Sequence, residues 1–99
     1  MSISLSKLNA SEPTVAIIGA GVSGLSIGWR LAQAGAQVEI FERSDPGRGA
    51  SWAAAGMLAA RSEAEPGEET LLQLNLKSQK MWPSFKDEVE AAAHMPIDY

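Results

Sequence analysis

The 99-residue sequence contains no cysteine and only one histidine. The lack of cysteine excludes disulfides, a thiolate nucleophile and cysteine-ligated metals from this chain, and it is compatible with a reducing cytoplasm, where we expect the protein to reside. The single histidine, His94, has no pair of ligand residues near it in the sequence. We therefore expect no metal site, assign no catalytic residue, and place His94 at a helix C-terminus, where partial positive charge suits the dipole.

Long apolar runs and positive charge are also scarce. No run approaches the roughly 18 residues that a membrane-spanning helix requires, so we expect no membrane span. The chain has 8 Lys and Arg residues and 12 Asp and Glu residues, which gives it a formal net charge of −4. Nucleic acids and anionic membranes repel such a chain, and we expect neither as a partner. Residues 1–12 lack the basic start and apolar core of a signal peptide and are interpreted as a flexible tail.

The most informative stretch is a short apolar run that leads directly into a Gly-x-Gly-x-x-Gly motif. The run, Val15–Ile18, is bounded by proline and glycine, which is typical of a central parallel strand covered on both faces. We expect Gly19 to turn the chain, Gly21 to let backbone approach a pyrophosphate, and Gly24 to let a helix pack tightly on the strand. The motif thus predicts a dinucleotide site; the alternative is a tight strand–helix turn without a ligand.

The residues after the motif continue a strand–helix–strand pattern. A helix is predicted from about residue 22 to 34, capped by Gly35, and a second strand over residues 36–42. Glu42 lies eighteen residues after Gly24, close to the spacing of about twenty at which an acid binds ribose hydroxyls. A carboxylate there disfavours NADP, whose 2′-phosphate it would repel. The alternative for Glu42 is a solvated acid at a strand end.

The second half of the chain predicts a loop, a small-residue stretch and a long helix. Residues 43–49 and 61–69 have loop composition, whereas residues 50–60 are nearly all small. Small residues let backbone approach a bulky, flat group, although composition alone favours an alanine-rich helix. The long helix is predicted over residues 68–93, kinked or divided at Pro83. Its expected core stripe comprises Leu71, Leu74, Ser78, Met81, Phe85 and Val89, with Leu72 and Trp82 alongside.

Together these residues resemble the N-terminal part of glycine oxidases, FAD-dependent enzymes of the D-amino-acid-oxidase-like family that serve thiamine biosynthesis. The resemblance rests on the glycine motif of residues 19–24, on Glu42-Arg43 and above all on residues 50–58, Ala-Ser-Trp-Ala-Ala-Ala-Gly-Met-Leu. It extends over residues 13–99. It implies an α/β fold in which a Rossmann-like FAD-binding βαβ unit precedes a long helix. Family members are far longer, so residues 13–99 would be the N-terminal part of an incomplete FAD-binding domain.

The resemblance also implies a set of cofactor contacts. In such a site the glycine motif holds the pyrophosphate, the acid binds the ribose with its basic neighbour beside it, and the small-residue stretch lies along the ribityl chain and the isoalloxazine ring. The residues implied are Gly19, Gly21, Val22, Ser23 and Gly24 for the pyrophosphate, Glu42 and Arg43 for the ribose, Ala50 and Ser51 for the diphosphate and ribityl region, and Ala55, Gly56 and Met57 for the ring.

The implied reaction is the oxidative deamination of glycine or a similar small amino acid or amine. The substrate loses hydride to the flavin and becomes an imine, and dioxygen reoxidises the flavin to give hydrogen peroxide. Two alternatives remain open: a D-amino acid or sarcosine as the substrate, or a nucleotide-binding fragment without catalysis. A homo-oligomer is neither indicated nor excluded.

Overall fold

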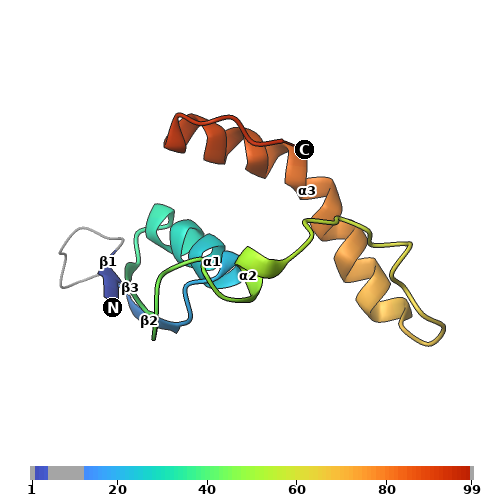
Figure 1. Cartoon of the computed structure of the whole chain (residues 1–99), viewed down its shortest axis with the longest axis horizontal. Helices are drawn as coiled ribbons and strands as arrows, with labels where there is room; N and C mark the ends of the chain where they lie inside the picture. The colour runs from blue at the N-terminus through green and yellow to red at the C-terminus, as the bar shows by residue number, and fades with distance from the viewer. Residues whose placement is uncertain (1, 5–12, 99) are drawn as a thin grey trace. The chain divides into compact units, whose positions relative to one another are not determined.

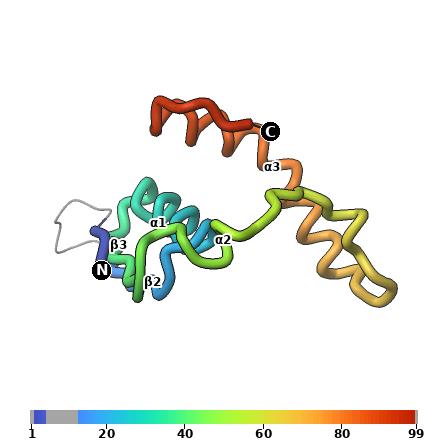
Figure 2. Tube along the Cα trace, in the orientation of Figure 1, coloured from blue at the N-terminus to red at the C-terminus, as the bar shows by residue number. Residues whose placement is uncertain are grey.

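The computed structural model describes residues 2–4 and 13–98. These residues form two compact units, Met1–Ala55 and Gly56–Tyr99, each of which is described by itself. Figures 1 and 2 trace the chain through both units. The first unit contains the sheet and the glycine motif, and the second contains the long helix.

The first unit is a three-stranded sheet with one main helix. Its elements are β1 (Ser2–Ser4), β2 (Thr14–Ile18), α1 (Val22–Gln33), β3 (Gln37–Phe41) and the short α2 (Ala50–Ala53). The strand order is β1-β3-β2, with β2 parallel and β1 antiparallel to β3. The predicted strand–helix–strand unit is confirmed, and Gly35 follows α1 with a φ of +101°, as expected of a residue just beyond a helix C-cap.

One face of this sheet forms the core because side chains alternate along each strand. The register pairs Val15 with Val38 and Ile17 with Ile40, which places all four side chains on the same face. Val38 and Ile40 are buried there. The other buried members of this hydrophobic cluster are Ala20 and Ala36, and the partly buried hydrophobic residues packed around them are Ile3, Val15, Ile17, Leu25, Leu31 and Ala32.

The prediction that the first apolar run is a central strand covered on both faces is wrong for the described residues. The central strand is β3, and β2 lies at the edge of the sheet. Ile18 is 84% exposed and its register partner Phe41 is also exposed. A continuous apolar run is typical of a strand that is covered on both faces, but among the described residues of this unit α1 is the one long helix that packs on the sheet.

The N-terminal segment departs from the flexible tail that was expected. Ser2–Ser4 form β1, in which Ile3 pairs with Ile40 and packs against the core. The alternation of serine with isoleucine is a strand pattern, too short to identify without its partner. Met1 and residues 5–12 lie outside the described residues, so the prediction stays untested there.

The second unit is built around the long helix α3 (Glu69–Ala93). Its bounds agree with the predicted helix, and Figure 1 shows it changing direction part-way along its length. Pro83 lies inside it, in agreement with the expected kink rather than with two separate helices. His94 is the C-cap, in left-handed conformation with a φ of +56°. Residues 95–98 form no strand.

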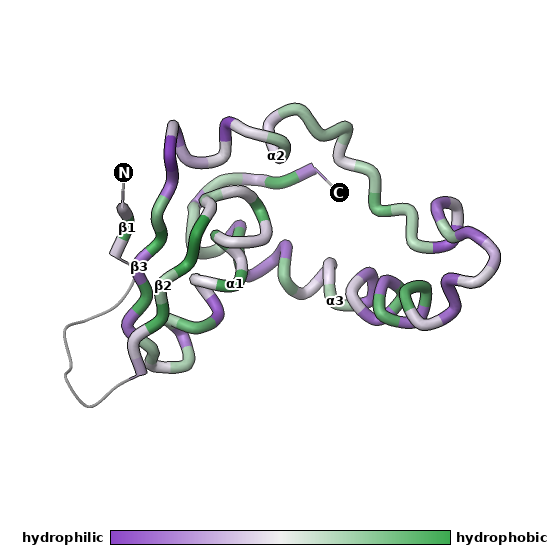
Figure 3. The backbone as a smooth tube through the Cα atoms, turned by 90° about the horizontal axis from the view of Figure 1, so that it is seen from below, coloured by the Kyte–Doolittle hydropathy of each residue, from purple (hydrophilic) through white to green (hydrophobic). Residues whose placement is uncertain are grey.

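The half-buried face of α3 agrees with the predicted stripe at Phe85 and Val89, and at Leu72 and Trp82 alongside it, and differs at the other positions. Leu71, Leu74 and Met81 are exposed. The half-buried positions form a neighbouring stripe: Leu72, Leu76, Gln79, Trp82, Phe85, Lys86, Val89 and Glu90. Hydrophobic and hydrophilic residues alternate along the helix, as the colours of the tube in Figure 3 show, so the pattern alone does not select the face. No helix in the described part of the chain has the length and apolarity to cross a membrane.

Candidate dinucleotide-binding site

The site begins where β2 ends and the chain turns into α1. The Gly19 N–H donates to the Phe41 carbonyl at 2.8 Å, which extends the pairing of β2 with β3 by one residue. Gly19 then adopts a φ of +106°, a conformation that side chains rarely permit. The expectation that Gly19 lets the chain turn sharply is confirmed.

Gly24 sets how closely α1 approaches the strand. A Cβ atom at this position would lie 2.0 Å from the Gly19 carbonyl oxygen and 3.3 Å from Cγ2 of Ile17. The first distance is far below van der Waals contact, and the atom it meets is backbone. The prediction that Gly24 permits tight helix–strand packing is therefore confirmed.

Gly21 is the N-cap of α1 and faces the short helix α2. A Cβ atom on Gly21 would lie 2.9 Å from Ser51 Oγ, and the Val22 N–H donates to that same oxygen at 2.8 Å. A polar oxygen from a residue 29 positions away thus meets the first turn of α1. The first N–H groups of a helix have no intrahelical acceptor and carry partial positive charge, so this end of α1 favours an anion.

Glu42 follows β3 directly and its carboxylate reaches the glycine motif. The Ala20 N–H donates to Oε1 at 2.9 Å, and Ser44 donates to Oε2 through its N–H at 3.0 Å and its hydroxyl at 3.2 Å. The Ala20 N–H, the Ser44 N–H and hydroxyl, and the Arg43 charge all favour the ionised form and lower the pKa of Glu42 from its ordinary value of 4.5, with desolvation opposing them. The site therefore holds a carboxylate at neutral pH.

This carboxylate makes unfolding depend on pH in a defined direction. Because the pKa of Glu42 is lower when folded, its stabilisation is present above pH 4.5 and is lost as the pH falls through the folded-state value. We expect Glu42→Gln to lower the melting temperature at pH 7, and the difference from wild type to shrink below pH 4.5. Thermal unfolding followed by circular dichroism measures this. Glu65→Gln removes an exposed carboxylate away from the motif as the control, and a difference constant from pH 7 to pH 3 would contradict the assignment.

Three contact residues were missed by reasoning from the sequence: Ala20, Ser44 and Gly47. Ala20 looks like a spacer between two glycines, yet it is fully buried, donates to Glu42, and accepts from the Gly47 N–H at 2.7 Å. Gly47, with a φ of +75°, thus ties the 43–49 loop to the glycine motif. The usable signal was Ser44, since a serine hydroxyl and N–H two residues after Glu42 are close enough in sequence for local hydrogen bonding.

The structure brings some of the predicted contact residues together and leaves others apart. Val22 and Ser23 open the first turn of α1, and Ala50 opens α2 next to Ser51. Arg43 is exposed beside Glu42, and Ala55, the last residue of the first unit, is exposed as well. Gly56 and Met57 belong to the second unit.

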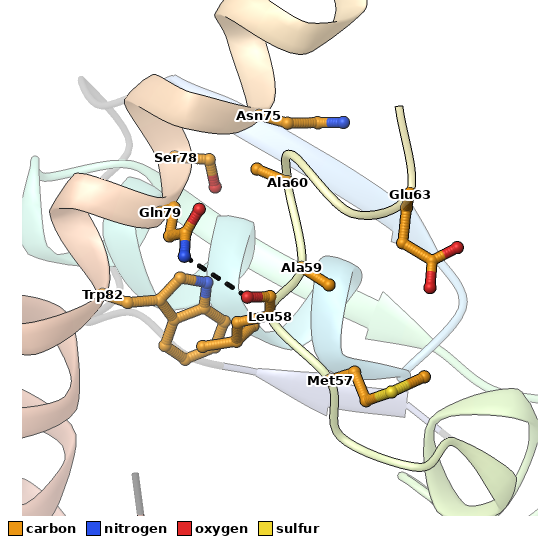
Figure 4. Close-up of a pocket in the computed structure, with 9 residues that line it drawn as sticks. All are labelled: Met57, Leu58, Ala59, Ala60, Glu63, Asn75, Ser78, Gln79 and Trp82. Atoms are coloured by element: carbon orange, nitrogen blue, oxygen red, sulfur yellow. Dashed lines mark hydrogen bonds between the residues drawn. The ribbon is translucent and has the colours of Figure 1, made fainter. Parts of the chain in front are cut away.

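The small-residue stretch is only partly helical, so the helical alternative holds for α2 alone. Ala54 has a ψ of 145° and ends the helix, and Gly56 has a φ of +78°. Met57 is 71% exposed. The end of this stretch and α3 line an open pocket of about 250 Å³, drawn in Figure 4, whose residues are Met57, Leu58, Ala59, Ala60, Glu63, Asn75, Ser78, Gln79 and Trp82.

The donor set of the first unit fits a dinucleotide. The N-terminus of α1 offers N–H groups and partial positive charge to a pyrophosphate, Gly21 presents no Cβ where Ser51 Oγ approaches it, and Glu42 offers carboxylate oxygens suited to ribose hydroxyls. The sequence of residues 14–99 matches the family described as FAD dependent oxidoreductase, abbreviated DAO. The chain belongs to this family. FAD is therefore the cofactor that this FAD-dependent oxidoreductase domain is built to hold.

Individual relatives in this family agree with the assignment. The chain is 45% identical to a glycine oxidase of Geobacillus kaustophilus over 83 residues, which is 84% of this chain and 22% of that protein. It is 39% identical to a glycine oxidase of Bacillus licheniformis over 82 residues, 82% of this chain and 22% of that protein. A putative thiamine biosynthesis oxidoreductase ThiO of Rhizobium etli is 41% identical over 69 residues, 69% of this chain and 21% of that protein.

The chain thus spans about a fifth of the length of these relatives. No solved structure matches it. The resemblance to glycine oxidases drawn from residues 19–24, 42–43 and 50–58 is confirmed at the level of the family and its cofactor.

Proposed function

We propose that this chain is the FAD-binding N-terminal part of a glycine-oxidase-type enzyme with a Rossmann-like fold. The observation that carries the proposal is the convergence of three features on the start of α1: the N–H groups after Gly21, the carboxylate of Glu42 and the hydroxyl of Ser51. In this arrangement the start of α1 binds the diphosphate of FAD, and the carboxylate of Glu42 binds its ribose.

Within this site the chain's residues bind and orient. The first turn of α1, with Gly19, Gly21, Val22, Ser23 and Gly24, holds the pyrophosphate, and Ser51 and Ala50 lie beside it. Glu42 binds the ribose hydroxyls, with Arg43 alongside. Ala55, Gly56 and Met57 run along the isoalloxazine, where the small side chains and the left-handed Gly56 leave the backbone accessible.

When bound, FAD would accept hydride from the carbon that bears the substrate amine, and dioxygen would reoxidise the reduced flavin and itself be reduced to hydrogen peroxide. The proposed substrate is glycine or a similar small amino acid or amine, which leaves as an imine. The names of the Geobacillus and Bacillus relatives support glycine, and the name of the Rhizobium relative supports a role in thiamine biosynthesis. No residue of this chain is proposed to bind the substrate carboxylate or to catalyse the reaction.

The test uses protein expressed from the complete reading frame. We expect it to purify with the visible absorbance of bound FAD and to release hydrogen peroxide when glycine is added. A panel of glycine, sarcosine and D-amino acids ranks the substrates by kcat/KM. Protein that is folded but retains no flavin, even after incubation with FAD, would contradict the proposal; flavin without peroxide from any amine would leave a binding role only.

A further inference from the structure

The half-buried stripe of α3 contains one uncharged amide side chain, Gln79, among mostly apolar residues. The two charged residues of the stripe, Lys86 and Glu90, pair with each other along the helix. Gln79 instead reaches off the helix: its Nε2 donates to the carbonyl oxygen of Leu58 at 3.3 Å. Figure 4 shows the side chain pointing from α3 toward that carbonyl. The one amide side chain of the stripe is thus directed at the segment that follows Gly56.

The segment of residues 54–59 has no regular secondary structure, so hydrogen bonds from side chains can restrain its backbone. Residues 54–59 form neither helix nor strand, so their backbone groups are not paired in a ladder. Gly56 bends the chain with a φ of +78°, and Met57 beside it is highly exposed. Leu58 comes two residues after Gly56, so a bond at its carbonyl restrains the direction in which the Gly56–Met57 backbone faces.

On the helix side, an aromatic pair lies next to this contact. Trp82, three residues after Gln79, packs edge-to-face on Phe85 with ring centroids 5.5 Å apart and planes at 86°. Trp82 also lines the pocket together with Leu58. An aromatic pair of this geometry stabilises α3 beyond what its buried area contributes, one helical turn away from Gln79.

From these contacts we infer that Gln79 is a positioning residue, which holds the Gly56–Leu58 backbone in the conformation that meets the flavin. The inference rests on the proposed function, because it takes Gly56 and Met57 to lie along the isoalloxazine. Gln79 itself acts only through the Leu58 carbonyl. Loss of the bond leaves the helix intact and lets the flavin-facing backbone move.

The test compares two variants with a matched control. Gln79→Met keeps the length of the side chain and removes the donor, and Gln79→Glu keeps the shape but offers a carboxylate, which cannot donate at neutral pH. Gln73→Met makes the same change at an exposed position of the same helix. The protein is labelled with ¹³C at the methyl groups of methionine, so that each methionine resonance reports its local environment. The Met57 resonance, assigned through Met57→Leu, reports the conformation of the Gly56–Leu58 segment. The Met81 resonance reports the conformation of α3.

In protein freed of flavin, both Gln79 variants should move the Met57 resonance toward the position of free methionine and leave Met81 unchanged. In titrations followed by flavin fluorescence, both should raise the Kd for FAD between about twofold and about tenfold, the effect of one net hydrogen bond. The visible circular dichroism of the bound flavin should change too, since it senses the backbone around the ring. Gln73→Met should match wild type in all three.

The outcomes separate this inference from the proposed function. If wild type binds FAD and the Gln79 variants match it in Met57 resonance, Kd and circular dichroism, the inference is wrong and the proposed function stands. If wild type itself binds no FAD, the proposed function fails and the flavin-positioning role fails with it. The Met57 resonance of the flavin-free variants then still decides whether the Gln79–Leu58 bond orders the segment.

Discussion

Alanine in place of Gly24 should disrupt the first unit more than any other single methyl group added to the glycine motif. The new Cβ would lie 2.0 Å from the Gly19 carbonyl oxygen, and neither the backbone of the turn nor the start of α1 can move without breaking the contact with β2. Overpacking against backbone gives an expected loss of about 3 kcal/mol or more in the free energy of unfolding. Urea denaturation followed by far-ultraviolet circular dichroism measures it.

The control for this variant is Ser26→Ala, a half-buried position less than one turn further along α1. Alanine favours helix there, so we expect little change in stability. Should Gly24→Ala unfold at the same urea concentration as wild type, the close approach of α1 to the turn would be wrong.

The second large effect is expected on cofactor binding. Valine at position 21 would bring its Cβ within 2.9 Å of Ser51 Oγ and project two methyl groups over the start of α1. These methyl groups occupy the space from which a pyrophosphate reaches the N–H groups of the first turn. Losing two such charge-assisted hydrogen bonds raises the Kd for FAD about 100-fold or more. Titration of the flavin-free protein with FAD measures the loss.

A double variant separates the two consequences of this change. Adding Ser51→Ala to Gly21→Val removes the side chain that the new Cβ meets, so it should recover part of any lost stability. It should not recover FAD binding, because the valine methyl groups still cover the helix start. Normal flavin retention in Gly21→Val alone would show that the pyrophosphate does not approach at this glycine.

In the candidate site, the local sequence predicts the roles of the motif glycines but not the contacts made by residues far along the chain. Gly19, Gly21 and Gly24 were each assigned a separate role from spacing alone, and the turn at Gly19 and the packing at Gly24 agree with the structure. These roles depend only on backbone within six residues. Ser51 and Glu42 meet residues of the motif that lie 29 and 22 positions earlier in the sequence, and no local pattern encodes such contacts.

For the long helix α3, the sequence predicts the bounds but not the face that becomes buried. Its bounds, Glu69–Ala93, follow from composition and from the residues that flank it. Its buried face does not, because apolar residues occur on several faces and the choice depends on what the helix meets. Here it meets the segment after Gly56, which places Gln79 inward and leaves Leu71 and Leu74 exposed.

The sequence by itself determined the βαβ unit, its glycine turn, the long helix and the family, since each depends on residues close together or on a short, specific motif. Only the tertiary structure decided that β3 rather than β2 is central, that Ser2–Ser4 join the sheet, and that Ala20 links Glu42 to Gly47. Those features are pairings between distant segments. Many pairings satisfy the same alternation of apolar residues, so their choice depends on the burial and hydrogen bonding of the whole unit.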